Sequence, residues 1–475
     1  MDDRRIERDG HLSSETRPHV DQPSLAQDEG VQSDQLTLLY DLDDRPPPQR
    51  FLLYSLQHLM TGFATMIGVP LAFAAAVGLE GTSRTALISG VLVAGGVMCV
   101  IQNLGLGPFG GRLPLVNEAT FKFMGPLIVA YKYGGFGAIY MASIISGSVI
   151  VVLGAFVGLI QRFLTPFIVG SFLIITGVSL MPIAMRNLLA VGKPYEATPE
   201  ALAAALIPLL TMIVIMTSRS VRMRGPRSLV VLIGFGVGYI FAAFAGLIDF
   251  TPVKEAGWFG LAMPFSAGAP SWPGMAIVVA FTLVFMACFI ETSGDASAVA
   301  AILGRKITAK QLRGAVMADG LSGPISSLFG GFPMTTYGQN VGLVRISGVG
   351  SRFVVAGTGV MLIIVGLVPK FAGVIAAMPS PVLGAGLAMT FGMITVEGVR
   401  RCGPYAGNAR NAAVLILGLL PALTLGGVPE ELLGRIPDTL APLMTDPLVS
   451  GLLVVLIAHL VFPGRTDMTR DHVTD

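Results

Sequence analysis

Charged side chains are scarce in this chain. Of its 475 residues only 13% are Asp, Glu, Lys or Arg, about half the share that a soluble domain carries. The mean hydropathy is +0.73, which excludes an ordinary water-soluble globule. Cysteine is rare as well: Cys99, Cys288 and Cys402 show neither a disulfide pattern nor the spacing of metal ligands. We therefore expect no metal site.

Long apolar runs take the place of charge. Hydrophobic residues make up 53% of the chain and glycine occupies 59 positions, which allows helices to approach closely in lipid. Runs of roughly 18–25 apolar residues, each long enough to cross a bilayer, recur from Phe51 to Phe462. The pattern predicts an all-α polytopic membrane protein with about fourteen segments, at 51–79, 83–105, 113–131, 134–160, 163–182, 199–218, 226–247, 272–301, 312–330, 335–347, 351–373, 380–398, 409–427 and 442–463.

Polar termini flank these segments. Residues 1–46 are rich in Asp, Arg, Ser and Gln, a composition typical of a disordered tail. Residues 465–475 form a second, short polar tail. The membrane domain is predicted to occupy residues 47–464.

Clusters of basic residues indicate the orientation, because Lys and Arg accumulate in cytoplasmic loops. If both termini are cytoplasmic, three clusters fall on that side, and the opposite loops hold only isolated charges. The clusters are Arg219, Arg222, Arg224 and Arg227, then Arg305, Lys306, Lys310 and Arg313, then Arg400, Arg401 and Arg410. We predict a multi-pass protein with both termini in the cytoplasm.

Segments three and ten are interrupted by proline and polar residues. The third begins LPLVNEATFKF and the tenth follows FPMTTYGQNVG. Aligned at Pro114 and Pro333, they match Thr120 with Gln339. The two segments lie seven places apart in the segment order. Because this offset is odd, the second copy crosses the membrane in the direction opposite to the first. Such a pair of interrupted segments indicates a binding site near the bilayer midplane, where the positive ends of half-helices face a ligand.

Acidic residues inside apolar segments are the first candidates for chemistry, because a charge in the membrane is costly. Glu291 and Asp295 are four residues apart and share one helix face, with a structural hydrogen bond as the alternative for each. Asp319 fits either a proton relay or a residue that orders the preceding segment. A lone histidine on an apolar helix, such as His58, is more often a packing residue.

Several stretches resemble the nucleobase–ascorbate transporter family, over about residues 40–463. They are YDLDDRPP at 40–47, SLQHL at 55–59, FIETSGD at 289–295, ADG at 318–320 and TTYGQNVGLVRIS at 335–347. The family signature Gln-Asn-x-Gly-x4-Thr/Ser is met by Gln339, Asn340, Gly342 and Ser347. Serine at the last position, where threonine is commoner, keeps the hydroxyl.

The resemblance implies a transporter domain, residues 47–464, of seven plus seven inverted segments. Its core domain would comprise about 51–160 and 272–373, and its gate domain about 163–247 and 380–463. Short strands would precede the half-helices of segments three and ten. Homodimers would form through the gate domains.

The resemblance also implies the residues of the site. Glu291 would accept hydrogen bonds from ring N–H groups of a base, Gln339 would pair with an oxo group and a ring nitrogen, and Asn340 would orient the loop. The implied substrate contacts are Glu291, Gln339, Asn340, Phe121, Gly338 and Thr120, and the implied coupling or supporting residues are Glu291, Asp319, Asp295 and His58. The proton would be the coupling ion, with no other cofactor and no nucleic-acid partner.

Glu118 and Lys122 stand outside the family's motifs. They are four residues apart in segment three, and we favour an ion pair between them along one helix. A charged pair at this position leaves the detail of the segment-three site open.

The implied function is proton-coupled uptake of an oxidised purine across the bacterial inner membrane. Gln339 and Asp295 are typical of the purine branch, whereas uracil carriers tend to have Glu and His there, and Thr120 favours urate over xanthine. A uracil or other nucleobase permease, a sulfate-type anion transporter of the same fold and a channel remain alternatives. Glu291 would repel an anion, and no nucleophile–base pair indicates an enzyme.

Overall fold

The structure, a computed structural model, describes most of the chain. The described residues are 38–157, 166–196, 198–217, 228–260, 264–265, 267–405, 407–425, 428, 430–433, 435–437 and 440–462. Most of the predicted tail 1–46, the whole of 465–475 and the basic cluster from Arg219 to Arg227 lie outside them.

Helices dominate the described residues. They are α1 (Pro48–Val77), α2 (Gly81–Leu104), α3 (Met124–Gly154), α5 (Pro166–Leu188), α6 (Pro199–Thr217), α7 (Ser228–Phe244), α8 (Thr251–Glu255), α9 (Met275–Ile302), α10 (Ala309–Leu328), α11 (Gly338–Ser347), α12 (Arg352–Gly366), α13 (Pro369–Ala376), α14 (Ser380–Cys402), α15 (Ala409–Thr424), α16 (Glu430–Leu433), α17 (Ala441–Met444) and α18 (Pro447–Val461). The remaining elements are the strands β1 (Asn117–Ala119) and β2 (Met334–Thr336) and the short 3-10 helices η1 (Phe121–Phe123) and η3 (Gly403–Tyr405). Within the described ranges, seven helices are long and apolar enough to cross a membrane, or up to eight if α12 and α13 form one bent span.

One predicted break between segments agrees with the structure, and two predicted segments differ from it. The predicted break between segments three and four lies inside α3, where Gly134 and Gly135 leave the helical conformation and Gly135 has a left-handed φ of 61°. The helical part of segment three starts only at η1, because residues 113–120 are not helical and include the strand β1. Segment eleven, predicted as one helix, is the pair α12 and α13, which meet at an angle of 82°.

Glycines bring together helices that are far apart in sequence. Helix α5 packs along α14, α3 along α10 and α2 along α12. A Cβ atom at Gly398 would lie 2.7 Å from the carbonyl oxygen of Gly170, and one at Gly320 would lie 2.7 Å from that of Gly147. Only a residue without a side chain permits this approach, as in other tightly packed membrane helices.

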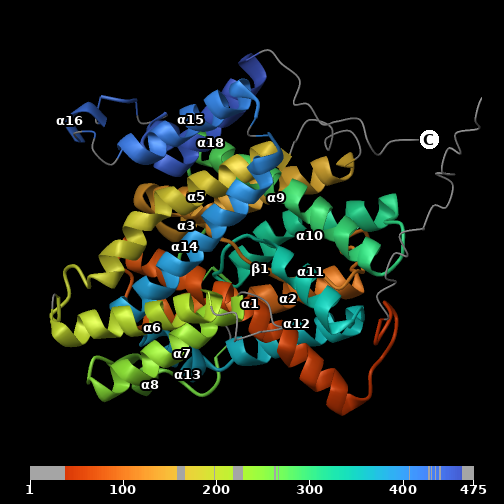
Figure 1. Cartoon of the computed structure of the whole chain (residues 1–475), viewed down its shortest axis with the longest axis horizontal. Helices are drawn as coiled ribbons and strands as arrows, with labels where there is room; N and C mark the ends of the chain where they lie inside the picture. The colour runs from red at the N-terminus through yellow and green to blue at the C-terminus, as the bar shows by residue number, and fades with distance from the viewer. Residues whose placement is uncertain are drawn as a thin grey trace, which may run out of the picture. The chain divides into compact units, whose positions relative to one another are not determined.

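The two strands lie at the centre of the helices (Figure 1). They pair antiparallel, with Glu118 opposite Thr335, and the Tyr337 N–H extends the ladder to the Val116 carbonyl at 2.9 Å. Extended backbone among apolar helices must pair its polar groups internally. Here each strand pairs with the other along one edge, and the Met334 N–H donates to the Ser322 hydroxyl at 2.9 Å. The strands that the resemblance implied before the half-helices of segments three and ten are thus confirmed.

The structure aligns the two interrupted segments differently from the alignment that matched Pro114 with Pro333. Thr120 is the N-cap of η1 and Tyr337 is the N-cap of α11. Equivalence by cap position therefore matches Thr120 with Tyr337 and Lys122 with Gln339. The proline alignment was wrong by two residues because the chain between proline and strand is longer in segment three.

Candidate functional site

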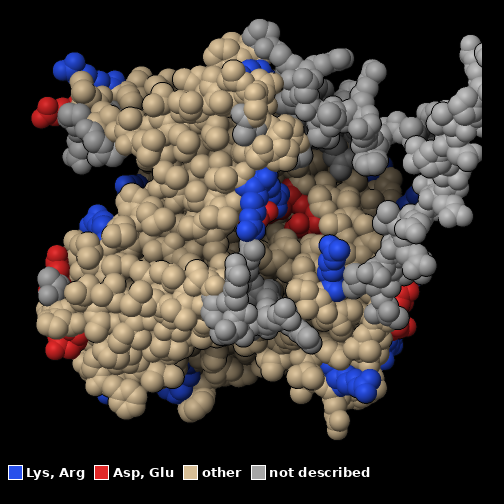
Figure 2. Space-filling model, viewed as in Figure 1, with Lys and Arg blue, Asp and Glu red and all other residues tan. Residues whose placement is uncertain are grey.

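A cavity of about 520 Å³ opens where the two half-helices meet α9 and α14. Six predicted site residues line it: Thr120, Phe121, Glu291, Asp295, Gly338 and Gln339. Figure 2 shows acidic and basic side chains together at a hollow in the middle of a largely uncharged face. The structure therefore brings together most of the residues that the sequence singled out.

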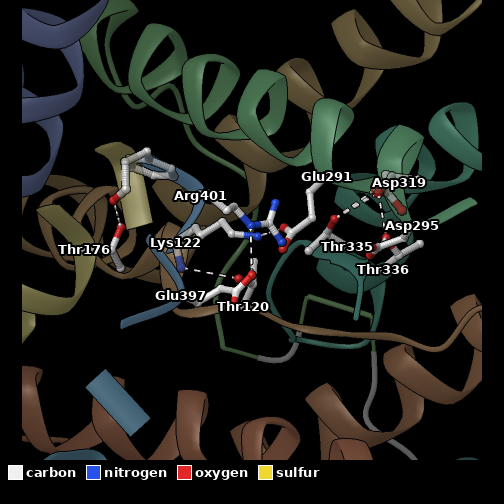
Figure 3. A network of polar contacts seen from close by, with 12 residues as sticks. Thr120, Lys122, Thr176, Glu291, Asp295, Asp319, Thr335, Thr336, Glu397 and Arg401 are labelled. Atoms are coloured by element: carbon white, nitrogen blue, oxygen red, sulfur yellow. Dashed lines mark hydrogen bonds and ion pairs between the residues drawn. The ribbon is translucent and has the colours of Figure 1, made fainter. Parts of the chain in front are cut away.

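Glu291 on α9 forms an ion pair with Lys122 on η1 (Figure 3). Both side chains are nearly enclosed, with exposed fractions of 8% for Lys122 and 11% for Glu291. Both also line the cavity. The carboxylate assigned to the substrate thus has a cation beside it.

The predicted pair between Glu118 and Lys122 was wrong. Glu118 lies in β1 and Lys122 in η1, so the four-residue spacing does not place them on one helix face. Glu118 instead accepts a hydrogen bond from the Thr65 hydroxyl of α1 at 2.5 Å. The strand directs Glu118 towards α1, and the following turn directs Lys122 towards α9.

Asp319 on α10 is buried beside the sheet. Its carboxylate accepts hydrogen bonds from the Asn117 amide at 3.0 Å, from the Thr335 hydroxyl at 2.9 Å and from Thr292. It does not line the cavity. Its position fits both predicted roles, since it ties α9 to β2 and also carries an ionisable group.

A chain of hydroxyl groups joins Asp319 to the cavity. Asp319 accepts from Thr292, whose hydroxyl lies 2.9 Å from that of Thr336, and Thr336 donates to Asp295 at 2.9 Å. Asp295 lines the cavity. Figure 3 shows this group of side chains on one side of Glu291 and Lys122 on the other.

Asn340 and His58 support the site from outside the cavity. The Asn340 side chain donates to the Pro114 carbonyl at 2.9 Å, and its oxygen lies 2.5 Å from His58 Nδ1. Neither residue is among those that line the cavity. Asn340 thus contacts α1 and the loop before β1, the kind of contact that an orienting role requires, while its direct contact with substrate stays a prediction.

Phe121 and Gly338 begin the two half-helices. The Phe121 ring packs edge to face against Phe391 of α14, with 5.1 Å between ring centroids. A Cβ atom at Gly338 would lie 3.2 Å from an Asp295 carboxylate oxygen. Glycine at this position therefore leaves the backbone and the carboxylate room beside the cavity.

Two charged residues of the cavity wall were not assigned to a site from the sequence. Glu397 and Arg401 on α14 line the cavity and pair with each other at 3.1 Å. Their spacing of four residues near a helix end is typical of an ordinary surface pair, so it gave no signal of a site. Across the described ranges, no group of three or more His, Cys, Asp or Glu side chains could hold a metal ion.

A helical membrane fold in which paired half-helices begin at a cavity lined by charged side chains is typical of membrane transporters. Residues 49–433 match the xanthine/uracil permease family, described as a permease family. The chain belongs to this family. It is a multi-pass membrane nucleobase permease and not an enzyme.

Individual relatives are consistent with this assignment. The uric acid permease PucK of Bacillus subtilis (strain 168) is 33% identical over 353 residues, which is 74% of this chain and 81% of PucK. The xanthine permease XanP of Escherichia coli (strain K12) is 30% identical over 462 residues, which is 91% of this chain and 96% of XanP. The murine Slc26a9 anion transporter, solved in an inward-facing state, shares the fold alone: the TM-score is 0.62 at 11% identity, over 88% of this chain and 69% of that one.

Proposed function

We propose that the protein takes up an oxidised purine, urate or xanthine, together with a proton across the bacterial inner membrane. The supporting observation is that Glu291 and Gln339 line one cavity from two different helices. An oxidised purine alternates N–H donors and C=O acceptors along its edge. A carboxylate and an amide match that alternation, and bases with another pattern would leave buried polar groups unpaired.

The remaining cavity residues have roles that follow from their positions. Phe121 offers an aromatic edge and Gly338 a bare backbone at the start of a half-helix, where N–H groups lack helical partners. Thr120, next to Phe121, is the proposed determinant of urate against xanthine. Asn340 and His58 act indirectly by holding α11 against α1 and the loop before β1.

The coupling proton has several possible carriers. Glu291 was the first candidate, but Lys122 already supplies it with a positive charge. The hydroxyl chain from Asp295 to Asp319 ends on carboxylates that contact hydroxyl and amide groups rather than a cation. We therefore propose that Asp295 and Asp319 hold and relay the proton, while Glu291 holds the base.

Alternating access would arise between two sets of helices. The close packing of α5 with α14, and of α2 and α3 with α12 and α10, supports a gate domain of 163–247 and 380–463 and a core domain of 51–160 and 272–373. We propose fourteen segments in two inverted halves, dimers that form through the gate domains, and cytoplasmic termini. The cavity would then be exposed to each side of the membrane in turn.

Uptake of radiolabelled xanthine and urate tests the function directly. Cells that express the protein should accumulate one or both bases against a gradient, and a protonophore should abolish the accumulation. Competition by unlabelled uracil distinguishes a pyrimidine carrier. Facilitated entry that a protonophore does not change would contradict proton symport.

Cysteine labelling tests the orientation. In a background without the three native cysteines, a cysteine at Lys306 should resist an impermeant thiol reagent in intact cells, whereas one at Lys193 should react. The reverse pattern would contradict cytoplasmic termini.

A further inference from the structure

The ion pair between Lys122 and Glu291 is an unusual feature of the cavity wall. A lysine that is only 8% exposed is costly to place in a membrane interior unless its charge is used. Lys122 meets a carboxylate that the proposed function assigns to the substrate. Its ammonium group therefore lies beside the position that a bound base would occupy.

Comparison of the two half-helices also places Lys122 beside the proposed substrate position. Lys122 is the second residue of η1 after the N-cap Thr120, and Gln339 is the second residue of α11 after the N-cap Tyr337. Both line the cavity. Lys122 thus occupies, in one half, the place that the proposed amide contact Gln339 occupies in the other.

Charge in the cavity is unequally distributed. Its wall carries the carboxylates Glu118, Glu291, Asp295 and Glu397 and the cations Lys122 and Arg401. Arg401 is held by Glu397 at 3.1 Å. Among the described cavity residues, Lys122 is therefore the cation adjacent to Glu291.

We infer that Lys122 is a specificity-determining residue that selects purines in their anionic form, an inference that rests on the proposed function. Glu291 accepts a ring N–H group, and the Lys122 ammonium donates to the neighbouring oxo group or deprotonated ring nitrogen. Without Lys122, Glu291 would repel an anion. With it, the pair presents an acceptor and a charged donor side by side, and hydrogen bonds to charged groups are among the stronger ones.

Glu118 and Asp295, the two cavity carboxylates outside the Lys122–Glu291 and Arg401–Glu397 pairs, fit this inference when they carry protons. Glu118 accepts from Thr65 at 2.5 Å and Asp295 from Thr336 at 2.9 Å. Each would repel an anionic base when ionised. A proton that enters with the base and resides on one of them cancels that charge, so the anion and its proton cross together.

A purely structural counter-ion would behave differently. If Lys122 served only to neutralise Glu291, its removal would weaken all bases equally or destabilise the protein. A residue that contacts the anion instead changes the ratio of affinities between charged and neutral bases. The ratio is therefore the measurement that separates the two roles.

The probes are xanthine and 8-azaxanthine, which carry the same oxo groups. Replacing C8–H by nitrogen makes the ring N–H more acidic, so that 8-azaxanthine is anionic at neutral pH while most xanthine is neutral. Binding to the purified full-length protein in detergent is measured with radiolabelled xanthine and unlabelled competitor. Wild type, Lys122→Gln, Lys122→Arg and the exposed control Lys310→Gln are compared.

Wild type should prefer 8-azaxanthine by roughly tenfold, the worth of one hydrogen bond to a charged group. Lys122→Gln should lose that preference, while Lys122→Arg and Lys310→Gln should keep it. An equal ratio in wild type and Lys122→Gln, with xanthine still bound, would overturn the inference and leave the proposed function standing. If wild type bound neither base, both would fail, and if Lys122→Gln did not fold, the absence of an anion preference in wild type would by itself overturn the inference.

Discussion

The units β1–η1 and β2–α11 share one backbone plan but present different chemistry to the cavity. Each is a three-residue strand, a capping residue and the start of a helix. The first two helical residues are Phe121 and Lys122 in one unit and Gly338 and Gln339 in the other. The β1–η1 unit therefore offers an aromatic ring and a cation (the charged wall), and the β2–α11 unit offers bare backbone and an amide (the amide wall).

This difference shows how an inverted repeat makes an asymmetric site. The repeated feature is the backbone: two strands that pair with each other and two helix starts that line one cavity. The side chains at equivalent positions differ, because the two strands pair through their backbone groups. Side-chain contacts, such as those of Asn117 and Thr335 with Asp319, add to this pairing. Glu291 on α9 lies outside both units and is contacted by Lys122 of the first. The base would thus be bound by different groups from the two related units and by Glu291, which belongs to neither unit.

The largest effect is expected from Glu291→Gln, which removes the carboxylate that pairs with Lys122 of the β1–η1 unit. Glutamine keeps the shape but offers a donor where an acceptor is needed and leaves Lys122 without its carboxylate. Loss of one partner from a buried ion pair is costly, so we expect purine binding to weaken by at least roughly a hundredfold and accumulation to disappear. Xanthine binding and uptake at matched expression measure this. The exposed Glu255→Gln should behave like wild type, and near-normal accumulation by Glu291→Gln would exclude Glu291 from the site.

The next effect is expected at the amide wall. Gln339→Ala removes both a donor and an acceptor, and we expect xanthine affinity to fall by roughly tenfold or more while the protein still reaches the membrane. Gln339→Lys makes the two units alike and should be as weak, because lysine has no acceptor. Competition binding measures both, with the exposed Gln57→Ala as control. If Gln339→Lys bound xanthine normally, the proposed division between a charged wall and an amide wall would be wrong.

Much of the architecture could be predicted from the sequence because it depends on local composition. Apolar runs predict membrane helices, and the prolines with polar residues near Pro114 and Pro333 predict the interruptions. The register between the interruptions could not be predicted, since proline ends a helix without fixing where the strand begins. Glu291 and Asp295 were found because carboxylates are rare in apolar segments.

The partner of Lys122 could not be predicted from spacing. A four-residue interval suggests a helical pair, but Glu118 belongs to a strand and Lys122 to the turn that follows it. Whether residue 117 starts a strand or continues a helix depends on pairing with β2, which is more than two hundred residues away in the sequence. The same dependence hid the hydroxyl chain from Asp295 to Asp319, because threonines in a polar patch do not indicate which carboxylates they contact.

Asp319→Asn should affect substrate affinity less than the two preceding variants do, but it should slow transport clearly. Asp319 accepts from donors of both strands, namely Asn117 and Thr335, yet it does not line the cavity. We expect transport to slow by roughly tenfold while affinity stays within about threefold, because the proton relay is lost and the contacts to the base are kept. Initial uptake rate and equilibrium binding, measured on the same preparation, separate these. An equal loss in both would indicate that Asp319 only holds the sheet and α9 in place.

The smallest effect is expected from Thr120, which caps the charged unit. Its hydroxyl accepts from the Lys122 N–H at 3.4 Å, and it lines the cavity between Glu118 and Phe121. Asparagine is also a good capping residue, so Thr120→Asn should keep η1 in place while it changes the size and polarity of the wall. We expect the ratio of urate to xanthine affinity to change by about two- to fivefold, with Thr120→Ser close to wild type because it keeps the hydroxyl. Competition of both unlabelled bases against radiolabelled xanthine measures the ratio. If Thr120→Ala and Thr120→Asn both left it unchanged, the choice between urate and xanthine would lie with the amide wall instead of the charged one.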